Sequence, residues 1–191
     1  MRRWRTVAAA LVLAGAGVAG TAGAAEAATG PVGNAAPPAA CSAVWGSGDK
    51  SVTDADAAPL TGIRTGRHAC YDRMVFDTGA AAGKLGYHVG YVDAFHQDGS
   101  GARIPVKGGA ILQIYVSAPS YDPATGRQTY AGSAGKSLPG VDLSGYKTFT
   151  DTKFGASFEG QTQIGLGVRA KLPFRVLQSG HQLIVDVAHT W

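Results

Sequence analysis

The chain has 191 residues, a formal net charge of +4 and 16% charged residues. Its lysines and arginines are scattered singly, so the sequence lacks the basic stripe by which proteins bind nucleic acid, and we expect no nucleic-acid partner. A chain of this length can bury the core of one domain but is short for two.

Residues 1–27 are predicted to be an export signal, because three arginines precede a short run of Ala, Leu, Val and Gly that ends in small residues. Glycines interrupt the apolar run, so a permanent membrane anchor is the poorer interpretation and no stable membrane insertion is expected after cleavage. The candidate cleavage sites are Ala24, Ala27 and Ala28. Export by the general or the twin-arginine route stays open, and we favour the general route because the consensus around Arg2-Arg3 is weak.

Loss of three arginines and Glu26 with this signal lowers the formal charge from +4 to +2. The mature chain is expected to be secreted, either free or associated with the cell wall.

Residues 28–59 are predicted to be a flexible leader followed by an N-terminal arm. The residues of the leader are small and uncharged and include prolines, so the leader cannot bury enough apolar surface to offset its ordering entropy. Cys41 and Cys70 are the only cysteines, and an even count in an exported chain indicates one disulfide, worth roughly 3 to 4 kcal/mol on the chain-entropy estimate. Two buried thiols are the alternative. Trp45 is expected to pack on the domain beside the disulfide.

From about residue 60 the apolar residues follow a period of two, which indicates β-strands. Strands are expected at residues 72–77, 87–95, 103–107 and 110–118, and a hairpin is expected near the C-terminus. Residues 119–145 are rich in Pro, Gly and Ser and are expected to form a long surface loop. Residues 60–191 therefore predict an all-β fold, a compact β-sandwich of short antiparallel strands with long loops.

Residues 158–172 alternate almost completely between an apolar and a polar face. The polar face carries Glu159, Gln161, Gln163 and Arg169 beside two glycines, Gly165 and Gly167. Such a face could bind a sugar or peptide close to the backbone, with the glutamines as hydrogen-bonding groups. The alternative is a solvated strand face on which the glycines mark a bend. Glu159 is poorly supported as a catalytic acid because the strand offers no partner carboxylate.

The motif Asp77-Thr78-Gly79 follows two apolar residues, as the catalytic motif of aspartic proteases does. One copy would require a dimer of the retroviral type. The simpler interpretation is a strand that ends in three good turn residues.

Polar residues also gather around Cys70, where Arg67, His68 and Arg73 are predicted to form a rigid cationic edge suited to carboxylates. The alternative is that Arg73 pairs with its neighbour Asp72 within the sheet. The five histidines show no metal-ligand spacing, so we expect no metal and no cofactor.

Several segments together resemble the AMIN-like domain of exported proteins and lipoproteins from high-GC Gram-positive bacteria. They are "RTGRHACYDRMVFD", "GYHVGYV", "DGSGARIPVKGGAILQIYV", "SFEGQTQIGLGVRAKLPFRV" and "LIVDVAHTW". The related AMIN domain is a small β-sandwich that targets cell-wall amidases and secretin-type proteins and is thought to bind peptidoglycan. The resemblance implies a non-catalytic envelope-binding module, and transfers no catalytic residues. The chain lacks the lipoprotein cysteine next to the signal, so no lipid is expected.

The sequence thus predicts a secreted module whose partner is a cell-wall polymer such as peptidoglycan, or alternatively a structural component that binds an envelope protein. One assay of proteolysis distinguishes the protease alternative from a binding module. We expect no proteolysis of denatured casein at acid pH. Acid proteolysis that vanishes in Asp77→Asn would establish the protease instead.

Overall fold

The computed structural model describes residues 41, 43–53, 58–80 and 83–191 of the chain. The predicted signal and the leader up to residue 40 lie outside the described residues. Among the described residues no helix could span a membrane.

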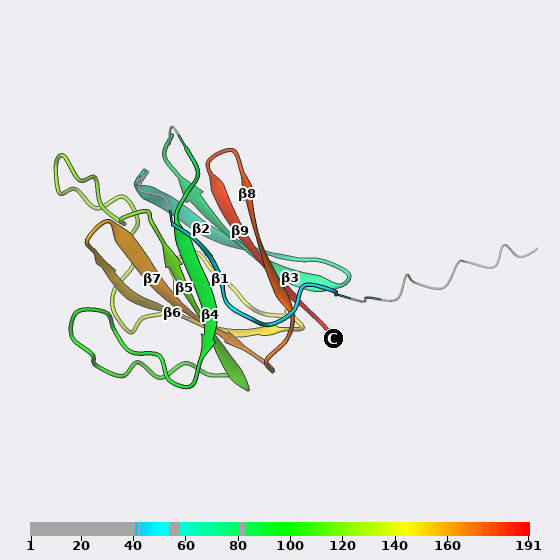
Figure 1. Ribbon diagram of the computed structural model, residues 1–191. Helices are drawn as coiled ribbons and strands as arrows, with labels where there is room; N and C mark the ends of the chain where they lie inside the picture. The colour runs from blue at the N-terminus through cyan, green and yellow to red at the C-terminus, as the bar shows by residue number, and fades with distance from the viewer. Residues whose placement is uncertain (1–40, 42, 54–57, 81–82) are drawn as a thin grey trace, which may run out of the picture. The chain divides into compact units, whose positions relative to one another are not determined.

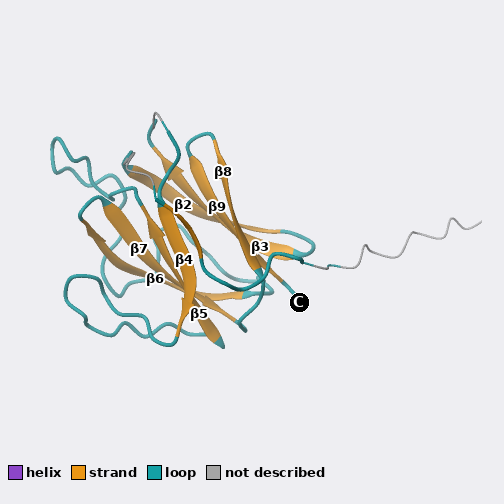
Figure 2. Ribbon diagram, in the orientation of Figure 1, coloured by secondary structure: helices purple, strands orange, loops and turns teal. Residues whose placement is uncertain are grey.

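Two antiparallel sheets pack face to face (Figures 1 and 2). The five-stranded sheet has the order β1-β4-β5-β7-β6, and the four-stranded sheet has the order β2-β3-β9-β8. The strands are β1 (Lys50–Val52), β2 (Leu60–Arg67), β3 (Tyr71–Thr78), β4 (Tyr87–Val92), β5 (Ala110–Val116), β6 (Phe149–Phe158), β7 (Gln161–Val168), β8 (Phe174–Ser179) and β9 (Gln182–Ala188). The predicted all-β sandwich is confirmed.

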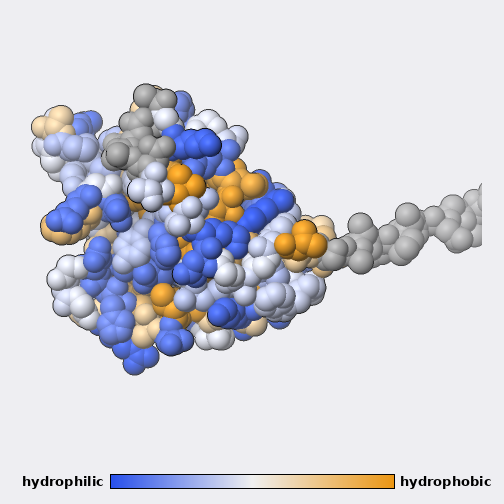
Figure 3. Space-filling view, viewed as in Figure 1, coloured by the Kyte–Doolittle hydropathy of each residue, from blue (hydrophilic) through white to orange (hydrophobic). Residues whose placement is uncertain are grey.

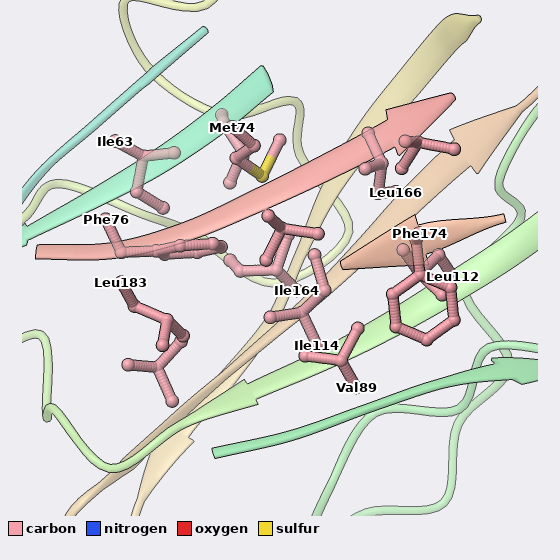
Figure 4. Packing of buried hydrophobic residues seen from close by; sticks show 14 of the residues in the cluster. Ile63, Met74, Phe76, Val89, Leu112, Ile114, Ile164, Leu166, Phe174 and Leu183 are labelled. Atoms are coloured by element: carbon pink, nitrogen blue, oxygen red, sulfur yellow. The ribbon is translucent and has the colours of Figure 1, made fainter. Parts of the chain in front are cut away.

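The core lies between the two inner faces. Leu112, Ile114 and Ile164 from the five-stranded sheet belong to one hydrophobic cluster with Phe76 and Leu183 from the four-stranded sheet (Figure 4), and all five are fully buried. Each such side chain contributes about 1.5 to 3 kcal/mol of hydrophobic stabilisation. Because both inner faces are used for packing, any ligand must bind on an outer face or at an end of the sandwich.

The strand predictions are partly confirmed. The strands near residues 72–77 and 110–118 and the C-terminal hairpin are present, and the strand predicted over 87–95 ends at Val92. The strand predicted over 103–107 is wrong, since this segment has only an isolated bridge between Arg103 and His96. β1, β2 and β6 were not predicted.

The alternating stretch from residue 158 spans two strands. Phe158 ends β6, the chain reverses at Glu159-Gly160, and β7 begins at Gln161. Both turn residues have positive φ, 48° at Glu159 and 79° at Gly160, which is the conformation that two-residue hairpin turns require.

The N-terminal arm joins both sheets. The predicted Cys41–Cys70 disulfide is present, and the ring of Trp45 lies 5.7 Å from that of Tyr71, beside the disulfide as expected. The carbonyl of Gly46 accepts a hydrogen bond from the Phe174 amide at the start of β8. A few residues further along the chain, β1 pairs with β4 of the other sheet.

A buried hydrogen-bonded network closes one end of the sandwich. Asp72 is fully buried, and its carboxylate accepts hydrogen bonds from the backbone amides of Thr148 and Phe149, at 2.6 and 3.2 Å. The His189 Nε2 lies 3.1 Å from the same carboxylate, and its Nδ1 lies 3.2 Å from the carbonyl of Ala69. The His189 ring therefore lies between the Asp72 carboxylate and the Ala69 carbonyl. The alternative pairing of Asp72 with Arg73 is wrong, because adjacent residues of a strand point to opposite faces.

We expect Asp72→Asn to lower the free energy of unfolding by about 2 to 3 kcal/mol. A neutral amide has one acceptor oxygen where the buried carboxylate has two, which accept from the Thr148 and Phe149 amides and face His189. Urea denaturation measures the change. The matched control is Asp93→Asn, at an exposed position, which should stay within about 0.5 kcal/mol of the wild type. Equal effects of the two variants would contradict the assigned network.

Candidate functional site

A row of polar residues crosses the outer face of the five-stranded sheet. The strand register places Ser51 of β1 opposite His88 of β4, His88 opposite Tyr115 of β5, and Tyr115 opposite Gln163 of β7. Val89 and Ile114, the neighbours of His88 and Tyr115 in their strands, point into the core. The row is therefore formed by the period of two in four successive strands.

Gln163 is the buried member of this row, with 2% of its surface exposed. Its Nε2 donates to the His96 carbonyl at 2.8 Å and to the Tyr115 hydroxyl at 3.0 Å, and its Oε1 accepts from the Asp98 amide at 2.9 Å. The amide group is thus fully engaged within the protein. Gln163 therefore offers a ligand little surface, and its amide holds the segment after β4 and orients Tyr115.

Residues 93–109 cover the glycines that were predicted to form an open floor. Phe95 is fully buried against Gly155 and Gly165, and a Cβ atom added to Gly165 would lie 2.8 Å from its ring. The carbonyl of Lys107 similarly occupies the space beside Gly167. The prediction of a bare backbone floor is therefore wrong: the missing side chains make room for the protein's own loop.

Beside this covered area lies a groove of about 520 Å³, which we call the Tyr115 groove. Its lining residues are Ser51, Val52, Thr53, Tyr87, His88, Asp98, Tyr115, Ser117 and Gln161. The lining residues thus come from β1, β4, β5 and β7, from residues next to the ends of these strands, and from the loop after β4. Figure 3 shows that hydrophilic residues cover much of the molecular face on which β1 and β4 lie.

The groove offers both a hydrogen-bond donor and an acceptor. The Tyr115 hydroxyl accepts from Gln163, which leaves its own hydrogen for an acceptor on a ligand. Burial raises the pKa of Tyr115, and the nearby Asp98 carboxylate raises it further, so the hydroxyl stays protonated at neutral pH. Asp98 uses its Oδ1 to accept from the Gly99 amide at 3.1 Å, while Oδ2 has no hydrogen-bond partner within the described part of the chain.

The other residues predicted on this strand are not brought together. Gln161 is exposed and lines the groove, and Glu159 lies in the adjacent β6–β7 turn. Arg169 follows the far end of β7, so eight extended residues place it roughly 25 Å from Gln161. Its guanidinium donates to the carbonyl of His189. Arg169 therefore cannot belong to the same small site as Gln161.

The predicted cationic edge near Cys70 is divided between two faces of the four-stranded sheet. The His68 ring stacks on Tyr71 at 4.4 Å, and the Arg73 guanidinium lies 5.3 Å from the same ring. Arg67 instead lies against Gly145 in the loop before β6.

Arg73 forms a bidentate ion pair with Asp186, with distances of 2.7 and 2.9 Å. This hydrogen-bonded pairing raises the pKa of Arg73. Arg175 also donates to the Asp186 carboxylate. Neither Asp186 nor Arg175 was predicted as a site residue. No sequence motif links them to Arg73, more than a hundred residues away.

The Asp77 carboxylate is engaged in a structural ion pair. Arg64 donates to it at 2.9 and 3.3 Å, and Gln182 donates at 2.7 Å. Because β3 ends at Thr78, the geometry favours the interpretation of Asp77-Thr78-Gly79 as a strand end. Across the described ranges, His, Cys, Asp and Glu form no group of three or more that could hold a metal ion.

We expect Gly165→Ala to displace Phe95 and to lower the free energy of unfolding by about 1 to 3 kcal/mol, the usual cost of overpacking. Amide hydrogen exchange should quicken at Asp98 and Ile104, whose amides hold the covering loop. The control is Gly48→Ala, where an added Cβ has nothing within 4 Å. Unchanged exchange in Gly165→Ala would contradict this packing.

A family model described as the AMIN-like domain matches residues 58–189, a range that includes β2 to β9. Neither a curated protein nor a solved structure matches the chain.

Proposed function

Because the chain belongs to the AMIN-like domain family, we propose that it is a secreted, non-catalytic module that binds a cell-envelope polymer of the peptidoglycan type in the Tyr115 groove. The family is one of envelope-associated modules found in exported proteins. The disulfide is consistent with the same compartment, since such bonds persist in oxidising environments. The observation that carries the proposal is the groove itself, an open polar and aromatic site across four strands.

The chemistry of the groove suits a sugar–peptide polymer. Its volume of about 520 Å³ lies within the range of small-ligand sites and would accommodate a short section of a chain. The Tyr115 hydroxyl can donate to a carbonyl or ether oxygen, and the Asp98 carboxylate can accept from a sugar hydroxyl, an amide or an amine. Tyr87 and Tyr115 add aromatic surface, which packs against the apolar faces of sugar rings.

The same residues give little support for hydrolysis. Glycosidic cleavage uses two carboxyl groups placed on either side of the scissile bond. Of the residues that line the groove in the described ranges, only Asp98 carries a carboxylate. The proposal is therefore binding without bond cleavage.

Gln161 is the predicted ligand residue that the proposal keeps in the groove, and Tyr115 is the residue that it adds. Ligand contacts by Glu159, Arg67 and Arg169 stay predictions, and each lies outside the groove lining.

The test is co-sedimentation of the protein with isolated peptidoglycan sacculi. We expect saturable pelleting of the wild type and a loss of about tenfold in affinity in a Tyr115→Phe, Gln161→Ala double variant, which removes two hydrogen-bonding groups. Tyr115→Phe leaves the Gln163 amide bonded to the His96 carbonyl, so the loop after β4 keeps its anchor.

The control is Gln128→Ala, an exposed glutamine outside the groove lining, which should pellet as the wild type does. No pelleting of the wild type at any salt concentration would end the peptidoglycan proposal and favour an envelope protein as partner. Equal pelleting of the wild type and the double variant would remove the groove as the site.

A further inference from the structure

Two arginines share one buried carboxylate on the outer face of the four-stranded sheet. Asp186 on β9 is fully buried and is flanked by Arg73 on β3 and Arg175 on β8. Arg73 contacts both carboxylate oxygens, and the Arg175 Nε donates to one of them at 2.9 Å. The three strands are adjacent, so the cluster is part of the rigid sheet.

The cluster carries one positive charge in excess, because a single carboxylate neutralises only one of two guanidinium groups. In the neighbouring pair on the same face, the single guanidinium of Arg64 meets the single carboxylate of Asp77, so that pair is neutral. The Arg73 and Arg175 side chains are 25% and 33% exposed, so solvent reaches both. The two terminal nitrogens of Arg175 have no hydrogen-bond partner in the described part of the chain.

Aromatic rings hold these guanidinium groups in position. The Arg175 guanidinium lies 4.3 Å from the Trp45 ring and 5.3 Å from the Tyr71 ring, and Arg73 lies 5.3 Å from Tyr71. Trp45 is in turn held by the arm that the Cys41–Cys70 disulfide and the Gly46–Phe174 hydrogen bond attach to the domain. Long side chains fixed in this way lose little entropy when they bind a ligand, which favours affinity.

We propose that Arg73 and Arg175 form a second binding site, for a carboxylate or phosphate oxyanion carried by an envelope polymer. Guanidinium groups match both oxyanions in geometry and charge. The site lies on the sheet opposite to the Tyr115 groove, so oxyanion binding is independent of that groove. Only the assignment of the oxyanion to an envelope polymer rests on the proposed function.

The test uses the full chain with Trp4→Phe and Trp191→Phe, which leaves Trp45 as the only tryptophan. Soluble polyglutamate and polyphosphate are titrated separately, and the fluorescence of Trp45 is followed. We expect a saturable change with at least one of them, and the polymer that binds more tightly identifies the oxyanion. Either polymer supports the proposal.

Arg175→Gln should weaken this binding at least about tenfold, since it removes charge-assisted hydrogen bonds. Asp186 keeps Arg73 as its partner in this variant, and urea denaturation checks that the fold is retained. Arg175→Lys keeps the charge but not the planar fork, and it should bind less tightly than the wild type.

The matched control is Arg127→Gln, which removes the same charge from an exposed loop and should change the affinity by less than about twofold. The absence of a saturable change with both polymers would overturn the proposal. An equal loss in Arg127→Gln and Arg175→Gln would also overturn it, because net charge alone would then explain binding. Failure of the sacculus assay leaves this titration unaffected, since neither polymer contains sugar.

Discussion

The buried amide of Gln163 determines how the outer face of the five-stranded sheet is divided. An amide removed from water must find hydrogen-bond partners, and this one finds them in the His96 carbonyl, the Asp98 amide and the Tyr115 hydroxyl. The first two bonds hold the segment after β4 down on the sheet, where Phe95 fills the space left by glycines. The third leaves the Tyr115 hydroxyl with a hydrogen to donate at the edge of the covered area. On one side of Gln163 the segment after β4 therefore covers the sheet, and on the other side lies the Tyr115 groove.

The two outer faces differ in the ligand chemistry that they offer. The Tyr115 groove combines neutral hydrogen-bonding groups with one carboxylate, whereas the cluster around Asp186 has an unneutralised guanidinium. Because the hydrophobic core uses both inner faces, these two sites lie on opposite sides of the sandwich. A ligand in one proposed site would not block the other, so the two proposals together allow the module to contact two chains, or two chemical groups of one polymer, at the same time.

The N-terminal arm contributes to both sites. Ser51, Val52 and Thr53 line the groove, and Trp45 supports Arg175 on the opposite sheet. These residues precede the range 58–189 that matches the family model. The disulfide and the pairing of β1 with β4 place the arm across both sheets, so the family domain and the segment before it act as one structural unit.

Alternation of apolar residues along the chain is enough to predict the all-β sandwich, the C-terminal hairpin and the two faces of β7. The disulfide was equally predictable, because only two cysteines were available to pair. What covers each face depends on tertiary contacts. Alternation places Gln163 on the outer face, but residues 93–109 decide whether that face meets solvent or a loop. The partners of Arg73 depend on tertiary contacts too, since strand order brings β3, β9 and β8 together from distant parts of the chain. The physical reason is that backbone periodicity is local, while burial and ion pairing arise from contacts between segments far apart in the chain.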